Sequence, residues 1–472
     1  MLDVHCTTGN RHDTQLGWEF ANEGKRVQTW AYAALRARRN VFIRNRRWCH
    51  TMARNNQSGG YSKSGTRSPG RRRMLQVVGG SSLGLLAGCI GSSLGGDGDD
   101  GPITIGSLQP LSGNFAPWGA AHSAGLEFAI DEVNADGGVL DREIEIVEAD
   151  TESNPSEGDS IFRNFVEQEG AVALTGPVSS DLGIRTAQTA EEMEVPIVFH
   201  MAGSHEALRK SSRYTFRVGS LTAMMDIQNQ VDLIAEKGFQ KVGAIMADYA
   251  WGQSVNEQLE ERMPDDIDLT KAVTPLGESD FSSQLRDMPD DLEMMIASGN
   301  PPGQIPIHNQ LRELDLDPEI TTGAGFPPSV LFGGLGAANA ETFGHIHIVD
   351  PYSDQFNDVA SSYADETGEL MDTHVGLGYV AGELISTAIE NAGEADPEQI
   401  ATEIRNIELD TILAAPLQYT EYGEIDEVVT MFSTFETGGP DYYPEGDYSL
   451  VEYHRSDPLS GDIVEPYLED DW

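Results

Sequence analysis

Short apolar runs alternate with longer amphipathic stretches between residue 102 and about residue 350, and this alternation constrains the fold more than any other feature. The run 103–107 is typical of a strand, 119–136 carries apolar residues at helical spacing, and 143–149 alternates as a strand does. Units in this order predict a parallel sheet covered by helices, which is α/β architecture. Further strands and helices are expected within 155–169, 172–176, 181–199, 223–246, 252–274, 281–297, 303–322, 326–349 and 353–391.

The part of the chain from residue 102 onward is too long for one domain. It holds about 370 residues, and chains beyond roughly 250–300 residues normally divide because a single hydrophobic core stops growing. We therefore expect two doubly wound, Rossmann-like lobes. In such sheets the loops that follow the strands converge on a crevice, which is where a ligand binds.

Charge divides the chain near residue 88. Residues 1–88 hold 15 of the 30 Lys and Arg residues but 4 of the 77 Asp and Glu residues, so 89–472 carry 15 basic against 73 acidic side chains, a net charge of −58. Self-repulsion at this density destabilises a compact fold in dilute salt, whereas molar salt shortens the Debye length to about 3 Å. The composition indicates adaptation to a salt-saturated environment, such as that of halophilic archaea, and argues against a nucleic-acid partner.

The boundary between the two charge regimes carries an export pattern. Arg71 and Arg72 precede a run of about 14 weakly apolar residues, which is the order of a twin-arginine signal. The run is shorter than the roughly 20 apolar residues of a membrane span. It ends in the lipobox LAGC, so Cys89 is expected to carry a lipid and to anchor the protein to the outer face of the cell membrane; a chance apolar loop ending in cysteine is the alternative. We assign 1–70 to a mis-called start or n-region, 71–88 to the signal and 89–101 to a Gly/Ser/Asp tether.

Catalytic and metal-binding patterns find no support in the sequence. The segment GSSLG (91–95) fits the nucleophile elbow G-x-S-x-G and GDGDDG (96–101) fits the dinucleotide G-x-G-x-x-G, but neither lies between an expected strand and helix, so we assign both to the tether. The segment HEALR has Arg209 where a zinc-binding H-E-x-x-H motif needs its second histidine, and there is no C-x-x-C. His345 and His347 share a face of an expected strand without a matched carboxylate, which is more typical of structural histidines. Cys89 is the only cysteine after the signal, so no disulfide is expected in the exported part. We expect no enzyme activity, no metal and no cofactor.

A set of short motifs follows in a fixed order: GSLQPLSGNFAPWG (106–119), GLEFAIDEVNADGGVLDREIEIVEADTESNP (125–155), GPVSSDL (176–182), EEMEVPIVFHMAGSHEAL (191–208), FRV (216–218), DYAWGQS (248–254), GESDFSSQL (277–285) and APLQY (415–419). In this order the chain resembles the type I periplasmic solute-binding proteins. Within them it is most similar to the branched-chain amino acid and amide-binding group that serves ABC importers.

The resemblance implies two lobes that are joined by a three-strand hinge and close over a solute. It also implies a monomer that delivers a small solute, an amino acid or an amide, to the permease and ATPase subunits of an importer. A ligand sensor of the same fold is the alternative; sensors ordinarily continue into a transmembrane helix, and the sequence shows none before Trp472. The lobes expected from the resemblance are 102–220 with 351–415, and 221–350 with 416–472.

Three serines lie in loops after expected strands, namely Ser112, Ser180 and Ser204. Hydroxyls and backbone amides at helix starts suit an anion such as a carboxylate, although a serine before a helix is commonly only an N-cap. The resemblance implies that Ser180, Ala202 and Ser204 hold the ligand carboxylate. It also implies that Trp251 covers the ligand from the second lobe; core packing is the alternative for this tryptophan.

Phe326 and Phe343 complete the expected ligand contacts. Phe343 stands where amino-acid binders of the resembled group commonly carry an acid that pairs with the ligand's α-amino group, and an unpaired ammonium in a closed cleft is costly. Another acid, such as Asp248 or Asp350, takes this role, or Glu341 is the aligned acid, or the ligand is not an α-amino acid. A branched-chain amino acid is therefore the implied ligand, with amides, urea and small carboxylates as open alternatives.

Overall fold

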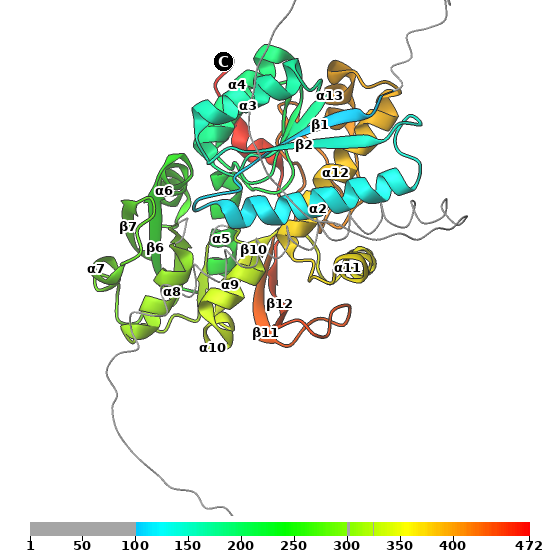
Figure 1. The fold of residues 1–472 in the computed structure, drawn as a ribbon. Helices are drawn as coiled ribbons and strands as arrows, with labels where there is room; N and C mark the ends of the chain where they lie inside the picture. The colour runs from blue at the N-terminus through cyan, green and yellow to red at the C-terminus, as the bar shows by residue number, and fades with distance from the viewer. Residues whose placement is uncertain (1–100, 300–302, 324) are drawn as a thin grey trace, which may run out of the picture. The chain divides into compact units, whose positions relative to one another are not determined.

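Two lobes, each built on its own sheet, make up the part of the protein that the computed structural model describes, namely residues 101–299, 303–323 and 325–472 (Figure 1). Helices cover largely parallel strands in both lobes, which confirms the predicted fold class. The expected export and lipidation residues and segments lie outside the described part of the chain: Arg71, Arg72, Cys89, 1–70, 71–88 and most of 89–101.

The first sheet is parallel throughout and has the strand order β2-β1-β3-β4-β5. Because β1 lies between β2 and β3, the strand order reverses at β1, and the loops after these strands open on a common crevice. The strands of this sheet are β1 (Ile103–Gln109), β2 (Ile144–Asp150), β3 (Ala173–Thr175), β4 (Ile197–Phe199) and β5 (Thr215–Arg217).

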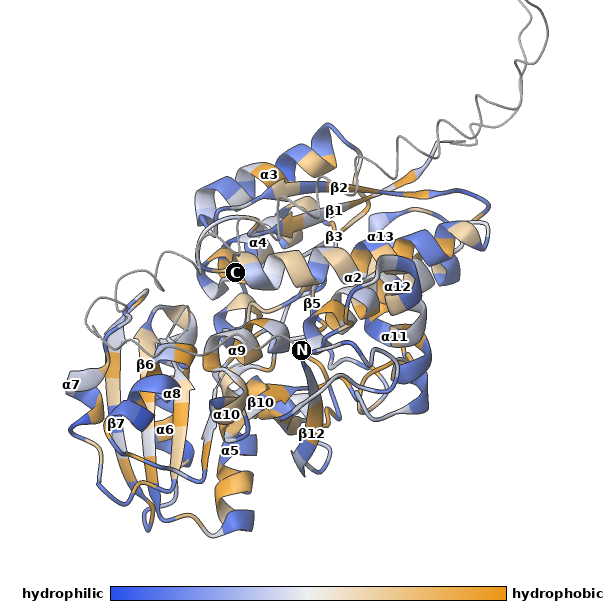
Figure 2. Cartoon of the chain, turned by 60° about the horizontal axis from the view of Figure 1, so that its bottom comes forward, coloured by the Kyte–Doolittle hydropathy of each residue, from blue (hydrophilic) through white to orange (hydrophobic). Residues whose placement is uncertain are grey.

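Alternate residues of the first sheet pack on opposite layers of helices, as the two-residue period of a strand requires. Val198 lies in the cluster that includes α2, α12 and α13, whereas its neighbours Ile197 and Phe199 lie in the cluster of α3 and α4. Figure 2 shows hydrophilic and hydrophobic sides on α3 and α13. The helices of this lobe are α2 (Ala116–Ala135), α3 (Pro155–Glu167), α4 (Ser180–Met193), η1 (His205–Ala207), α11 (Asp354–Thr367), α12 (Thr373–Ala392), α13 (Pro397–Asn406) and η2 (Gly461–Tyr467).

The second sheet has the order β12-β11-β10-β9-β8-β6-β7 and is parallel except for β11, which runs antiparallel to both neighbours. Its strands are β6 (Lys241–Asp248), β7 (Asp268–Pro275), β8 (Met294–Ser298), β9 (Ile320–Thr322), β10 (Phe343–His347), β11 (Met431–Thr437) and β12 (Tyr448–Arg455). Its helices are α5 (Ala223–Lys237), α6 (Ala250–Arg262), α7 (Ser282–Leu285), α8 (Gln304–Glu313), α9 (Pro328–Leu335) and α10 (Ala337–Ala340).

The chain passes between the lobes after β5, after β10 and before β11. The second and third of these connections pair with each other. The amide of Asp350 donates to the carbonyl of Ile412 (2.9 Å), and the amide of Ala414 donates to the carbonyl of Ile348 (2.8 Å). Extended connections that pair in this way hold the two lobes together at one edge.

The C-terminal part divides differently from the expected lobe boundary. β11 and β12 join the second sheet, but Leu417, Tyr422 and Ile425 pack in the core cluster of the first lobe, and Val464 joins them after β12. These apolar side chains complete the first core, so the chain returns to the first lobe after β12. The expectation that all of 416–472 belongs to the second lobe is corrected by this packing.

Helices α2 and α12 approach each other closely through glycines. A Cβ atom at Gly125 would overlap the carbonyl oxygen of Val375, and one at Gly378 would overlap the carbonyl oxygen of His122. Because backbone atoms cannot move aside as a flexible side chain can, the spacing of the two helices requires residues without a Cβ atom at these positions.

Replacement of Gly378 by alanine therefore destabilises the protein, by about 1–3 kcal/mol as for other overpacked cores. The matched control is Gly333→Ala in α9, where a Cβ atom would meet nothing within 4 Å; this change is expected to be neutral or to stabilise the helix by about 0.5–1 kcal/mol. Urea unfolding of the two variants measures the difference, and equal stabilities would contradict the close helix packing.

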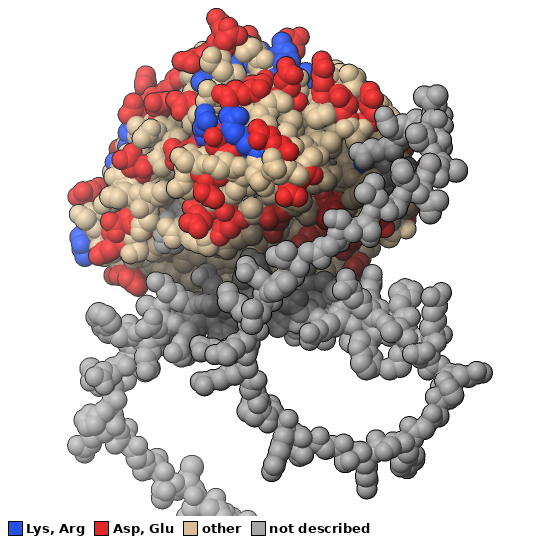
Figure 3. Space-filling model, turned by 45° about the horizontal axis from the view of Figure 1, so that its top comes forward, with Lys and Arg blue, Asp and Glu red and all other residues tan. Residues whose placement is uncertain are grey.

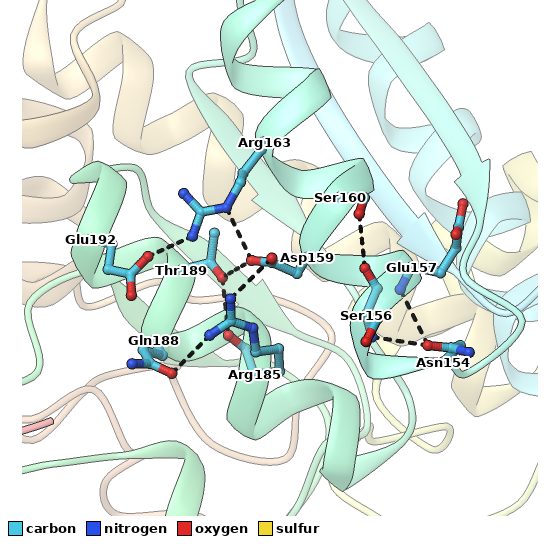
Figure 4. A network of polar contacts seen from close by, with 10 residues as sticks. All are labelled: Asn154, Ser156, Glu157, Asp159, Ser160, Arg163, Arg185, Gln188, Thr189 and Glu192. Carbon is cyan, nitrogen blue, oxygen red and sulfur yellow. Dashed lines mark hydrogen bonds and ion pairs between the residues drawn. The ribbon is translucent and has the colours of Figure 1, made fainter.

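Acidic side chains are spread over the surface that Figure 3 shows, with the few basic side chains set among them. None of the described helices is both long and apolar enough to cross a membrane. One of the basic groups is drawn in Figure 4, where Asp159 of α3 accepts hydrogen bonds from Arg163 Nε (3.2 Å), Arg185 Nη2 (3.0 Å) and Thr189 Oγ1 (2.6 Å). Burial alone would raise the pKa of Asp159, but the Thr189 and Arg185 hydrogen bonds and the two guanidinium charges hold it below its usual value.

Lowering KCl from molar to about 0.1 M is expected to lower the melting temperature, because the Debye length grows from about 3 to about 10 Å and the acidic surface repels itself. Differential scanning calorimetry at several KCl concentrations measures this. Sucrose at the same osmolality is the uncharged control. A melting temperature that sucrose restores as fully as KCl would contradict an electrostatic origin.

Candidate functional site

A cavity of about 50 Å³ lies between the two lobes and receives residues from both. One water needs roughly 10–15 Å³ on this scale, so the cavity as it stands has room for a few waters. Its walls lie after the carboxyl ends of the strands, which is where a doubly wound sheet binds its ligand. The first lobe contributes Phe115, Trp118 and Ser180 among others, and the second contributes Asp226, Tyr249 and Trp251.

Aromatic rings form a continuous wall that crosses from one lobe to the other. The ring of Trp118 lies 5.7 Å from that of Phe115 and 4.2 Å, edge-on, from that of Phe326, measured between centroids. Phe115 in turn lies 6.2 Å from Tyr249. The indole Nε1 of Trp118 donates to the carbonyl of Gly325 (2.8 Å). Since Trp118 belongs to the first lobe and Gly325 to the second, this hydrogen bond links the lobes beside the cavity.

Ser180 is the polar residue of the cavity that sequence reasoning placed there. It begins α4, and the Ser179 side chain does not cap the helix. The acid of the first turn, Asp181, accepts hydrogen bonds from its own backbone amide and from that of Ala250, so the Ser180 hydroxyl is the group that this helix start offers to a solute. The Ser180 hydroxyl accepts a hydrogen bond from the amide of Ser204 (3.2 Å), which leaves its own proton available to donate. Trp251, which also lines the cavity, is 6% exposed and its indole N–H has no partner in the part of the chain described.

Ala202 and Ser204 lie behind Ser180 instead of lining the cavity. The carbonyl of each accepts a hydrogen bond from the guanidinium of Arg217, that of Ser204 at 2.6 Å. Arg217 also pairs with Glu424 (Nε to Oε2, 2.9 Å), and both side chains are wholly buried. Burial raises the pKa of Glu424, and the charge and hydrogen bond of Arg217 oppose that rise. These residues fix the loop on which Ser180 rests.

The remaining expected contacts are placed outside the cavity. Ser112 lies beside Asp150: burial alone would raise the pKa of this acid, but hydrogen bonds from Ser112 and neighbouring backbone amides hold it below its usual value. Phe326 reaches the site only through its ring contact with Trp118. Phe343 is 1% exposed, begins β10 and packs edge-on against His308 with ring centroids 5.6 Å apart. Its place at the amino end of the strand is away from the cavity, which corrects the sequence-based placement.

The acids considered as replacements for Phe343 do not line the cavity either. Asp248 is exposed and accepts a hydrogen bond from Gln253 (3.1 Å), while Asp350 pairs with Arg455 (3.0 Å). Glu341 is exposed beyond α10. The acid that does line the cavity is Asp226 of α5. Sequence reasoning missed Asp226, because the residue lies near the start of the expected segment 223–246 and no recognisable motif surrounds it.

Comparison with known proteins accounts for this arrangement. Residues 102–436 match the periplasmic binding protein family. The chain belongs to this family. It is 30% identical to the Leu/Ile/Val-binding protein homolog 8 of Brucella abortus over 164 residues, which cover 32% of this chain and 40% of that protein. It is 36% identical over 92 residues to the chemotactic signal transduction system substrate-binding protein BasB of Halobacterium salinarum, covering 19% of this chain and 22% of BasB. The chain thus spans less than half the length of these curated relatives.

Solved structures of periplasmic binding proteins share the fold. The branched-chain amino acid transporter substrate-binding protein LivJ of Streptococcus pneumoniae, in complex with isoleucine, has a TM-score of 0.62 at 21% identity, covering 74% of this chain and 99% of LivJ. A solute-binding protein of an ABC transporter from R. palustris, in complex with benzoate, has a TM-score of 0.64 at 18% identity, covering 77% and 99%. The resemblance seen in the sequence is confirmed, and the protein is a periplasmic binding protein.

Five buried histidines of this periplasmic binding protein pack in a row beside the cavity, and we call this row the histidine file. Its members are His122, His200, His374, His345 and His347. The rings of His122 and His200 stack with centroids 4.2 Å apart, and His200 Nε2 lies 3.4 Å from His374 Nδ1. His345 and His347 stack at 4.9 Å, and His345 lies 6.0 Å from His374. No group of three or more His, Cys, Asp or Glu side chains in the described residues is arranged to hold a metal ion.

Burial holds these histidines in the neutral form. It lowers the pKa of His122 and of His374 to about 3 and that of His347 to about 4, and it lowers the pKa of His200 and His345 well below the usual value. Hydrogen bonds from or to Thr175, Thr373 and Ser433 satisfy one ring nitrogen each of His122, His345 and His347. His345 and His347 lie on one face of β10, as the strand period predicts, and His347 also lines the cavity.

The free energy of unfolding is expected to fall as the pH falls from about 6.5 towards 4. In this range the histidines of the unfolded chain bind protons, whereas those of the folded protein stay neutral because their pKa values are lower. Each such histidine contributes up to about 1.4 kcal/mol per pH unit. His122→Gln should reduce this slope relative to wild type, as measured by urea unfolding in molar KCl. Buried acids with a raised pKa, such as Asp226 at about 7, act in the opposite sense, so the difference between variant and wild type is the informative quantity. An unchanged slope would show that His122 is protonated in the folded state.

Proposed function

We propose that the protein is an extracytoplasmic receptor that binds a small solute in the cavity between its lobes and presents it to an ABC importer. The observation that supports this most is the cavity itself, which is lined by both lobes. It carries the Ser180 hydroxyl at the start of α4 and, at Trp251, an indole N–H without a partner among the described residues. Two relatives named as Leu/Ile/Val-binding or crystallised with isoleucine favour a branched-chain amino acid as the solute. A branched-chain amino acid suits the cavity because its carboxylate could bind at Ser180 and its aliphatic side chain could pack against the aromatic wall.

Binding and closure are coupled in this proposal. The hydrogen bond from Trp118 to Gly325 and that from the amide of Ala250 to the carboxylate of Asp181 both join the lobes around the cavity. A solute that contacts both lobes adds to these contacts only in the closed arrangement, so it shifts the population towards closure. The closed form would then dock on the permease, whose ATPases supply the energy of transport.

The cellular setting is part of the same proposal. Arg71 and Arg72 support export by the twin-arginine route, and Cys89 supports a lipid anchor at the outer face of the membrane. The acidic exported part and the Halobacterium relative support a halophilic source. That relative is named for chemotactic signal transduction, which favours a second candidate function, presentation of the bound solute to a membrane-embedded transducer.

The first test is a thermal-shift screen of the exported protein in molar KCl with L-leucine, L-isoleucine, L-valine, amides, urea and small carboxylates. A solute at 100 times its Kd stabilises the native state by about 2.7 kcal/mol, which raises the melting temperature measurably. We expect the branched-chain amino acids to do so. No shift with any member of this panel would contradict the proposed function.

Trp251→Ala is expected to weaken binding of the stabilising solute at least about tenfold, because buried aromatic anchors carry much of the energy of a site. Trp472→Ala is the matched control: this tryptophan is 37% exposed and stacks on Arg209, with the guanidinium carbon 4.4 Å from the ring centroid. Isothermal titration calorimetry measures both. Equal affinities for the two variants would place the solute elsewhere.

A further inference from the structure

The carboxyl group of Asp226 is the one acidic side chain lining the cavity within the described residues, and no lysine or arginine lines it there. The residue lies in the first turn of α5 and is 3% exposed. Gln230 Nε2 approaches its Oδ1 at 3.4 Å, which is a long hydrogen bond, and its Oδ2 is buried without any partner in the described part of the protein. One oxygen of this acid is therefore left unsatisfied by the described residues.

The neighbours of Asp226 hold it in place. Thr322 at the end of β9 donates through Oγ1 to Gln230 Oε1 (2.9 Å), so the amide group of Gln230 is oriented with its nitrogen towards Asp226 Oδ1. This orientation fixes one carboxylate oxygen and leaves the other without a donor among the described residues. Because α5 and β9 both belong to the second lobe, Asp226 is a fixed feature of that lobe.

A purely structural role does not account for the free oxygen. A buried carboxylate without a partner is costly, and so is a buried carboxylic acid whose proton has no acceptor. Burial raises the pKa of Asp226 to about 7, with the Gln230 hydrogen bond opposing the rise, so a cationic neighbour would readily ionise this group. A cationic donor entering the cavity satisfies both oxygen and charge.

We propose that Asp226 binds the ammonium group of the solute, so that the site selects α-amino acids over carboxylates that lack an amine. This inference rests on the proposed function. The solute carboxylate would lie at the amino end of α4 in the first lobe, where the Ser180 hydroxyl has a proton to donate. Positive and negative ends of one zwitterion are thereby held by opposite lobes.

The test compares matched pairs of probes by isothermal titration calorimetry in molar KCl: L-leucine with 4-methylpentanoate, L-valine with 3-methylbutanoate, and L-alanine with propanoate. Wild-type protein should bind the amino acid of a pair at least tenfold more tightly than its des-amino partner. Asp226→Asn should weaken amino-acid binding by roughly 10- to 100-fold, the range for a hydrogen bond to a charged group, and leave the des-amino partner unchanged or tighter. Asp232→Asn, on the exposed side of the same helix, should bind as wild type does.

Each result decides the proposal. Equal wild-type affinities within the pairs, or equal losses of both probes in Asp226→Asn, overturn the role of Asp226 while the receptor function stands. Binding of none of the probes by wild type overturns the receptor for amino acids as well. If Asp226→Asn does not fold, the wild-type comparison within each pair still decides, because it needs no variant.

Discussion

The geometry of the candidate site depends on one wholly buried ion pair, between Arg217 at the end of β5 and Glu424 in the connection that leads to β11. The same guanidinium donates to the carbonyls of Ala202 and Ser204, so one side chain joins the loop after β4 to the C-terminal part of the chain. Ser180 is positioned in turn by the Ser204 amide. Removal of one partner of a buried pair costs about 3–5 kcal/mol, because the other charge stays unpaired in a medium of low dielectric constant. The ion pair therefore determines the position of the amino end of α4, and with it that of Ser180, in the first lobe.

Local pattern was enough to predict the fold and one side of the site. Strand and helix periods predicted the β-α units from residue 102 onward, and a strand-loop-helix segment predicted Ser180 beside the crevice. Asp226 and the histidine file were not predictable, since their meaning comes from packing between elements far apart in sequence, as between His122 and His200 or His374 and His345. Phe343 was misplaced for a related reason: a motif alignment gives no information on where a strand begins, and β10 begins at this residue, away from the cavity.

The surface and the cavity use charge in opposite ways. The surface carries a large excess of carboxylates, and in molar salt the Debye length is about 3 Å, so the field of each charge is screened beyond that distance. Long-range electrostatic steering of a charged solute is therefore weak under those conditions. In the cavity, the carboxyl group of Asp226 is 3% exposed, so it acts on a bound solute through a medium of lower dielectric constant than water. For a protein of this composition, discrimination between solutes has to arise in the cavity.

Placement of the two charged contacts on opposite lobes connects recognition to movement. A carboxylate held only at Ser180 interacts with the first lobe alone, and an amine held only at Asp226 interacts with the second lobe alone. Neither has a differential affinity for the closed form beyond its apolar contacts, and a ligand shifts a conformational equilibrium only by that difference. A zwitterion reaches both contacts at once only when the lobes are closed. The residues that select the solute, Ser180 and Asp226, are therefore also those through which binding favours closure, because the same pair of contacts stabilises the closed arrangement.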